Sequence, residues 1–232
     1  IIISKEFLSQ LKKWRVRSDK ISYIPNWGNL EQINKVILKD QEFLTSNNLS
    51  SEKFRLVYSG TLALKHNPNL LVKIAKSNSD IEILIVGTGS GFHKLKEKSD
   101  LPNNIKLLPL QSFNKLNKVL STGDIFLAML NEDASKFSVP SKILNYLCAG
   151  KPIILSAPSD NLASQMIIES KAGKVFSPND FDSLNEFLKH IKNDDKLKTE
   201  MSNLGRIYAE QKFDIKKIVK KFESIFENLL IM

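Results

Sequence analysis

The segment Ser138-Val-Pro-Ser-Lys-Ile-Leu-Asn-Tyr-Leu-Cys-Ala-Gly-Lys-Pro-Ile-Ile-Leu155 predicts a loop, a helix and a buried strand, in that order. Pro140 cannot continue a helix from upstream, whereas Ser141 can accept hydrogen bonds from the free N–H groups of a first helical turn. Gly150 is a typical stop signal, and an apolar run follows it. Because a helix N-terminus carries unpaired N–H groups and the positive end of the helix dipole, this segment suits a phosphate.

The predicted helix has two different faces. Helical spacing places Lys142 and Asn145 on one face, with Ser141 one turn away from Asn145. The other face is mostly apolar and holds Ile143, Leu144, Leu147 and Cys148. A capped surface helix packed on a sheet would show the same pattern, so the phosphate interpretation depends on where the helix lies in the chain.

Short apolar runs alternate with helical patterns from Phe54 onward. Their starts lie 19 to 28 residues apart, which is the length of one strand plus one crossover helix. The runs are Leu56–Tyr58, Ile81–Val86, Ile105–Leu108, Asp124–Leu130, Pro152–Leu155 and Lys174–Phe176. Runs with little alternation are typical of strands covered on both faces, so the pattern predicts an α/β fold with a doubly wound, Rossmann-like parallel sheet.

The remaining patterns are mainly helical. Between the strands we expect helices at Asn69–Ser77, Phe92–Lys98, Asn114–Leu120, Lys142–Ala149, Leu162–Ser170 and Phe181–Lys192. After Asp194 the apolar spacing predicts a helical tail, Lys196–Gln211 and Ile215–Leu230. Before the sheet we expect a strand at Ile1–Ile3, a helix at Lys5–Trp14, a strand at Ile21–Ile24 and a polar connection from about Leu30 to Glu52.

In a doubly wound sheet, ligands bind at the carboxyl ends of the strands where the strand order reverses, usually between the first and fourth strands. The loops expected there are Ser59–Pro68 and Asn131–Pro140, and the second leads into the Ser141 helix. The topology therefore directs a phosphate-bearing ligand to Gly60, Lys65 and that helix. Gly87-Thr-Gly-Ser-Gly91 is a third glycine-rich turn, which a tight strand–helix connection would need for backbone reasons alone.

Composition argues against a nucleic-acid-binding protein, a membrane-spanning protein and a metalloprotein. The 232 residues carry a net charge of +9, from 34 Lys and Arg against 25 Asp and Glu, without a nucleic-acid-binding motif. Such a surface suits phosphorylated ligands or anionic lipid headgroups. The single cysteine fits a reducing compartment, and no apolar run is long enough to span a bilayer. The three histidines show no metal-ligand spacing, so no metal is expected.

Six landmarks along the chain occur together in one known family. They are Ile24–Trp27, Tyr58–Pro68, Ile85–Gly89, Leu108–Gln111, Val139–Lys142 with Leu147–Pro152, and Tyr208–Phe213. In this order and on these elements they resemble the C-terminal, donor-binding half of retaining GT-B-fold glycosyltransferases of family 4. Within that family the chain is most similar to bacterial enzymes that build surface polysaccharides, of the colanic-acid and aminosugar-transferase type.

The resemblance implies transfer of a hexosyl or N-acetylaminosugar group from a nucleoside-diphosphate sugar, expected to be a UDP-sugar, to a glycan or lipid-linked acceptor. It implies no cofactor and no metal, and a cytoplasmic enzyme with peripheral membrane contact as an option. A non-catalytic nucleotide-sugar-binding module and a GT-B-fold sugar-nucleotide epimerase are the alternatives. By the resemblance residues 1–52 end a preceding acceptor domain and form a linker, 53–212 bind the donor, and 213–232 form a crossover helix. Such a chain alone would bind donor without useful transfer.

The same resemblance assigns the site. Lys65 would act on the diphosphate as the catalytic charge, and the other donor-binding positions would be Gly60, Thr61, Gly87, Gly89, Leu110, Gln111, Val139, Pro140, Ser141, Lys142 and Asn145. Three positions depart from the family pattern, because Thr61 replaces a frequent arginine and Phe137 and Asn145 replace glutamates. These changes favour a donor sugar less hydroxylated than glucose.

Overall fold

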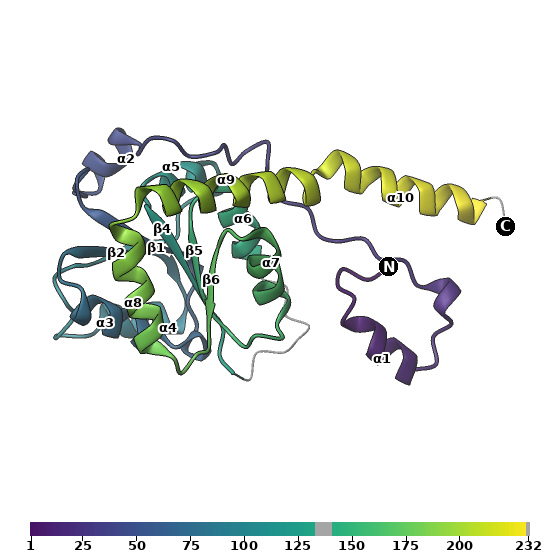
Figure 1. Cartoon of the computed structure of the whole chain (residues 1–232), viewed down its shortest axis with the longest axis horizontal. Helices are drawn as coiled ribbons and strands as arrows, with labels where there is room; N and C mark the ends of the chain where they lie inside the picture. Colours follow the sequence, from purple (N-terminus) through teal and green to yellow (C-terminus); the bar gives the residue numbers. More distant parts are fainter. Residues whose placement is uncertain (133–140, 231–232) are drawn as a thin grey trace.

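The computed structural model describes residues 1–132 and 141–230, and its centre is a six-stranded parallel sheet (Figure 1). The strand order is β3-β2-β1-β4-β5-β6. The strands are β1 Phe54–Thr61, β2 Ile81–Thr88, β3 Ile105–Pro109, β4 Ile125–Met129, β5 Ile153–Ser156 and β6 Gly173–Phe176. All six predicted runs are strands, and the doubly wound α/β prediction is confirmed.

Helices cover both faces of the sheet, because successive strand residues point to opposite sides. Leu56 and Tyr58 of β1 pack with one apolar cluster, and Val57 between them packs with the other. The first cluster includes side chains of α3 (Pro68–Ser77), α4 (Ser90–Lys96) and α8 (Phe181–Lys192). The second includes α5 (Leu116–Ser121), α6 (Ser141–Ala149), α7 (Leu162–Ser170) and α9 (Asp195–Lys212).

The sheet opens at the point where its strand order reverses. β1 pairs with β2 along eight positions, from Phe54↔Ile81 to Thr61↔Thr88. Its pairing with β4 consists of Leu56↔Ile125 and Val57↔Phe126. Beyond Val57 the two strands separate, and the backbone N–H of Ser59 donates instead to the hydroxyl of Tyr146 on α6, 2.9 Å away. The crevice that topology predicts between the first and fourth strands is therefore present.

A buried ion pair lies at the opposite end of the sheet. Arg55 Nε donates to Glu82 Oε1 at 2.6 Å, and both side chains are almost fully buried. The Arg55 guanidinium also donates to the carbonyl oxygens of Thr122, at 2.9 Å, and Ser50, at 2.6 Å. These bonds tie the segment before β1 to the amino-terminal end of the central strands.

The segment before the sheet differs from the prediction in two ways. The strands expected at Ile1–Ile3 and Ile21–Ile24 are reduced to one isolated parallel bridge, Ile2↔Tyr23. Two short segments paired at a single position do not make a ladder, and their neighbour in the chain, α1 (Phe7–Lys13), buries none of its residues. The expected polar connection contains a short helix, α2 (Gln41–Ser46), whose first turn donates to the Asp40 carboxylate.

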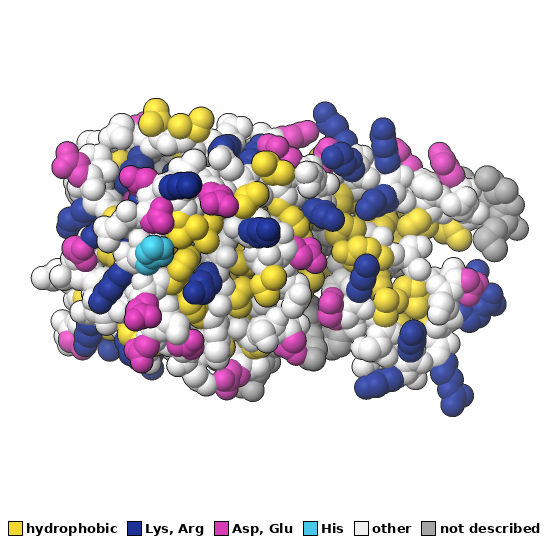
Figure 2. All heavy atoms as spheres, in the orientation of Figure 1, with side chains coloured by type: hydrophobic (Ala, Val, Ile, Leu, Met, Phe, Trp, Pro, Cys, Tyr) yellow, Lys and Arg dark blue, Asp and Glu magenta, His cyan; other side chains and the backbone are white. Residues whose placement is uncertain are grey.

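The last helix, α10 (Ile215–Leu230), extends away from the sheet (Figure 1). Ile218 is buried, while Val219, Phe226 and Leu229 are exposed. Lysines lie beside this apolar stripe, and Figure 2 shows basic side chains along the helix. Among residues 1–132 and 141–230, no helix combines the length and the apolar character needed to cross a membrane. The division at residues 52 and 212 stays a prediction.

Candidate functional site

A pocket of about 550 Å³ occupies the opening between the ends of β1 and β4. Its walls come from the end of β1, the loop after β3 and the first turns of α6. The predicted site residues that line it are Gly60, Thr61, Leu110, Gln111, Ser141, Lys142 and Asn145. The fold thus brings together residues from the end of a strand, a loop and the start of a helix that are far apart in the sequence.

The last residues of β1 and the residue after them, Gly60–Leu62, are called the Gly60 turn below, and Gly60 and Thr61 form one wall of the pocket. Gly60 has a φ of +118°, in a region that residues with a side chain rarely adopt. A Cβ placed there would lie 3.8 Å from Cε and 3.9 Å from Nζ of Lys142. The missing side chain therefore leaves backbone open to a ligand beside a lysine amine.

Lys142, in the first turn of α6, reaches across to β1. Its Nζ donates a hydrogen bond to the Tyr58 hydroxyl and lies 3.7 Å from the centre of the Tyr58 ring. Burial lowers the pKa of Lys142 to about 7, because the charged amine is largely removed from water. An anion in the pocket would restore the charged form.

Asn145 lies one turn further along α6 and is held by a residue that sequence analysis did not identify. Its Oδ1 accepts a hydrogen bond from Asn29 Nδ2 at 2.9 Å. Because Asn29 occupies Oδ1, a ligand that contacts the Asn145 amide would meet its NH₂ group as a donor. Nothing in the local sequence indicates this contact, because the two residues are 116 positions apart.

The loop after β3 contributes a partly apolar wall. Leu110 and Phe113 are each about half exposed, and Gln111 Nε2 donates to the Pro109 carbonyl at 2.9 Å. Exposed apolar side chains beside polar amides suit the flat face and polar edge of a nucleotide base.

His66 lines the pocket, whereas its neighbour Lys65 is exposed and lies outside the lining. The Ala63 backbone N–H donates to Nδ1 of His66 at 3.2 Å, which leaves Nε2 as the N–H donor of the neutral ring. Burial, together with Lys142 and Lys65, lowers the pKa of His66. The histidines have no metal-ligand spacing, and the sequence feature that points to His66 is its position in the loop after the first strand.

Gly87 and Gly89 do not line the pocket. A Cβ on Gly87 would lie 2.4 Å from the Gly60 carbonyl oxygen, and one on Gly89 would lie 2.9 Å from that of Leu62. Because these glycines lack side chains, the Gly60 turn can pack closely against the end of β2 and the residue that follows it. They therefore support this wall of the pocket without contacting a ligand. Val139, Pro140 and Phe137 lie outside the described residues.

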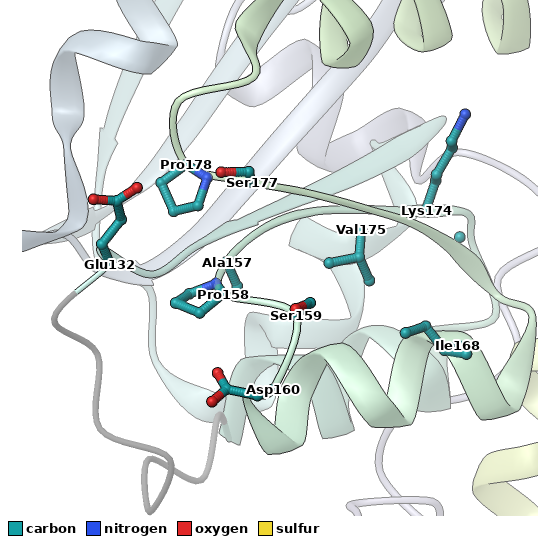
Figure 3. A pocket seen from close by; sticks show the side chains of 11 residues that line it. Glu132, Ala157, Pro158, Ser159, Asp160, Ile168, Lys174, Val175, Ser177 and Pro178 are labelled. Carbon is teal, nitrogen blue, oxygen red and sulfur yellow. The ribbon is translucent and has the colours of Figure 1, made fainter.

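A second cavity, of about 660 Å³, lies near the ends of β5 and β6 (Figure 3). Glu132 and Asp160 line it, and Glu132 accepts a hydrogen bond from Asn179 at 2.5 Å. The Lys174 amine points away from these two carboxylates (Figure 3). A diphosphate would meet negative charge here, so the pocket at Gly60 is the better anion site.

Metal binding has no candidate cluster in the described part of the chain. No group of three or more His, Cys, Asp or Glu side chains there is arranged to hold a metal ion. The expectation that the chain works without a metal or other cofactor stays a prediction.

Comparison with known proteins gives consistent results. Over 227 residues the chain is 23% identical to the putative colanic acid biosynthesis glycosyl transferase WcaI of Escherichia coli, covering 95% of this chain and 54% of WcaI. The chain thus spans about half the length of that relative. Sucrose-phosphate synthase of Thermosynechococcus elongatus superposes with a TM-score of 0.80 at 16% identity, over 99% of this chain and 58% of the synthase.

A further solved structure, Anabaena HepE in complex with UDP-glucose, superposes with a TM-score of 0.78 at 13% identity. The superposition covers 97% of this chain and 62% of HepE. At these identities the solved structures establish the fold, which is that of GT-B glycosyltransferases. The family model of glycosyl transferases group 1 matches residues 39–208, and the chain therefore belongs to that family.

Proposed function

We propose that the chain binds a nucleoside-diphosphate sugar, specifically a UDP-sugar, in the pocket between β1 and β4. The observation that carries this proposal is the meeting of the Gly60 turn, the Lys142 amine and the start of α6 at one pocket. Backbone N–H groups at the start of a helix and a nearby amine both favour a diphosphate. The uracil would lie against Leu110 and Gln111, with the ribose at Asn145.

The chemistry proposed is transfer of the donor sugar to a glycan or lipid-linked acceptor. Negative charge builds on the β-phosphate oxygen as the bond to the sugar breaks, and cations aimed at that oxygen stabilise the transition state. We expect Lys142, Lys65 and the Nε2–H of His66 to supply this stabilisation. Removing one such group typically raises the barrier by roughly 2.7–4 kcal/mol.

The biological setting we propose is the synthesis of a bacterial surface polysaccharide, at the cytoplasmic side of the membrane. The similarity to WcaI supports this setting, as does family membership. Stereochemical retention and a donor that is an N-acetylated or deoxy sugar follow from the family resemblance and are part of the proposal. The chain would supply the donor half of the reaction, and a further domain would supply the acceptor.

Calorimetry with UDP, GDP and dTDP tests the donor proposal directly. We expect UDP to bind most tightly and uridine to bind more weakly, because it lacks the diphosphate. Lys65→Ala should weaken UDP binding much more than uridine binding, whereas Asn145→Ala should weaken both about equally. Absence of binding to all three diphosphates at millimolar concentration would refute the proposal.

A further inference from the structure

Tyr58, in the second half of β1, joins two walls of the pocket. The side chain is fully buried, and its hydroxyl donates to the Thr61 carbonyl oxygen at 2.8 Å. The same hydroxyl accepts the hydrogen bond from Lys142 Nζ. A chain of two hydrogen bonds therefore runs from the first turn of α6 to the turn that contains Gly60.

This contact fixes the direction of a side chain that is normally mobile. A lysine side chain has about four rotatable bonds, and ordering it when a ligand binds costs conformational entropy. Here the amine already rests on the Tyr58 ring, 3.7 Å from its centre, beside Gly60. The amine is thus placed at the open backbone before any ligand arrives.

The groups named here around this amine include no carboxylate. Tyr58 faces it from β1, His66 in the 3-10 turn Leu64–His66 is close enough for the amine to lower its pKa, and Tyr146 follows it on α6. None of these groups is a carboxylate, and Lys142 forms no ion pair within residues 1–132 and 141–230. Burial without a counter-charge explains why its pKa falls to about 7.

We propose that Tyr58 is a positioning residue that holds the Lys142 amine against the Gly60 turn, where this amine contacts the diphosphate of the donor. The inference rests on the proposed function and adds a specific division of roles to it. The Lys142 amine is held in position in the pocket before a ligand binds, and the exposed Lys65 adds positive charge from outside the lining. Tyr58 acts through Lys142 and does not itself contact the ligand.

A double-mutant cycle on the 232-residue chain tests this coupling. Tyr58→Phe keeps the ring and removes the hydroxyl, and Lys142→Met keeps an unbranched side chain without the charge. We expect Tyr58→Phe to weaken UDP binding roughly tenfold, the loss of about one charge-assisted hydrogen bond, and to leave uridine binding unchanged. In the Lys142→Met background, Tyr58→Phe should have no further effect on UDP affinity.

Proton uptake provides a second readout that a merely structural role for Tyr58 and Lys142 would not change. At pH 8 the Lys142 amine is mostly neutral, so binding of UDP should draw roughly one proton from the buffer. Calorimetry in two buffers of different ionisation enthalpy measures this number. Lys142→Met should abolish the uptake. The matched control Lys65→Met, which removes an exposed lysine, should weaken UDP binding but retain the uptake.

The outcomes separate the two proposals. If the wild-type chain binds none of UDP, GDP and dTDP, the proposed function fails and this inference fails with it. If UDP binds but Lys142→Met retains both the affinity and the proton uptake, the inference is overturned and the donor site stands. Additive effects in the cycle, or an equal loss of uridine binding in Tyr58→Phe, would also overturn it.

Discussion

Replacing Tyr146 by phenylalanine tests whether its hydroxyl compensates for the separation of β1 and β4. The Tyr146 hydroxyl accepts the backbone N–H of Ser59 at 2.9 Å, and both residues are buried. Its ring also stacks on Phe126 of β4, with centroids 4.5 Å apart, and this contact would be kept in the variant. The hydroxyl also donates at longer range to the carbonyl oxygens of Leu127, at 3.4 Å, and Ser59, at 3.5 Å, so the substitution removes the acceptor of the Ser59 N–H together with these weaker contacts.

The cost follows from the hydrogen bond that is lost. A buried N–H group without a partner costs about 1–3 kcal/mol. For a chain of this size, each kcal/mol shifts the melting temperature by about 2–4 °C. We expect Tyr146→Phe to lower the free energy of unfolding by about 1–3 kcal/mol and the melting temperature by roughly 2–12 °C.

Urea denaturation followed by circular dichroism measures this difference, and Tyr208→Phe is the matched control. The Tyr208 hydroxyl donates to Glu169 at 2.9 Å in a half-exposed setting, where water can replace the lost partner. We expect the control to change stability by less than about 1 kcal/mol. Equal stability of Tyr146→Phe and the wild type would show that the Ser59 N–H does not depend on this hydroxyl.

Three further predictions concern Gly87 next to the Gly60 turn, the buried thiol of Cys148 and the buried amine of Lys142. Gly87→Ala places a Cβ 2.4 Å from the Gly60 carbonyl oxygen, so it should displace the turn and weaken UDP binding more than Lys65→Ala does, as measured by calorimetry. Cys148 should not react with a thiol reagent in the native chain, because the residue is buried and its pKa is raised to about 12; labelling at the same rate in native and urea-unfolded protein would contradict this. Lys142 titrates near pH 7 when folded and near 10.5 when unfolded, so the unfolded chain binds more protons between these values and wild-type stability should rise across this window. In urea titrations, Lys142→Met should therefore be more stable than the wild type at pH 6 to 7, and this difference in the free energy of unfolding should shrink toward pH 10. A difference that does not change with pH would contradict the lowered pKa of Lys142.

The sheet was predictable because its strands are buried on both faces. Runs such as Ile81–Val86 have almost no polar residues, and their spacing left room for a crossover helix each time. The predictions that were wrong concern the segment before the sheet, where tertiary contacts override local sequence preference. Ile1–Ile3 and Ile21–Ile24 have strand composition but meet at a single bridge, and α2 is only six residues long in a polar segment.

The candidate site was predictable where topology alone brings loops together. The ends of β1 and β4 and the start of α6 meet as expected, because the carboxyl ends of parallel strands lie at one edge of a sheet. The contacts between side chains could not be predicted. Asn29 reaches Asn145, and Tyr58 reaches Lys142, through packing between segments that are distant in the chain.

A crystal structure of the chain with bound UDP tests the central claim most directly. The account predicts the diphosphate between the Gly60 turn and the start of α6, with Lys142 Nζ within hydrogen-bonding distance of a phosphate oxygen and the uracil against Leu110 and Gln111. Density for UDP in the cavity lined by Glu132 and Asp160, with the pocket at Gly60 empty, would contradict it.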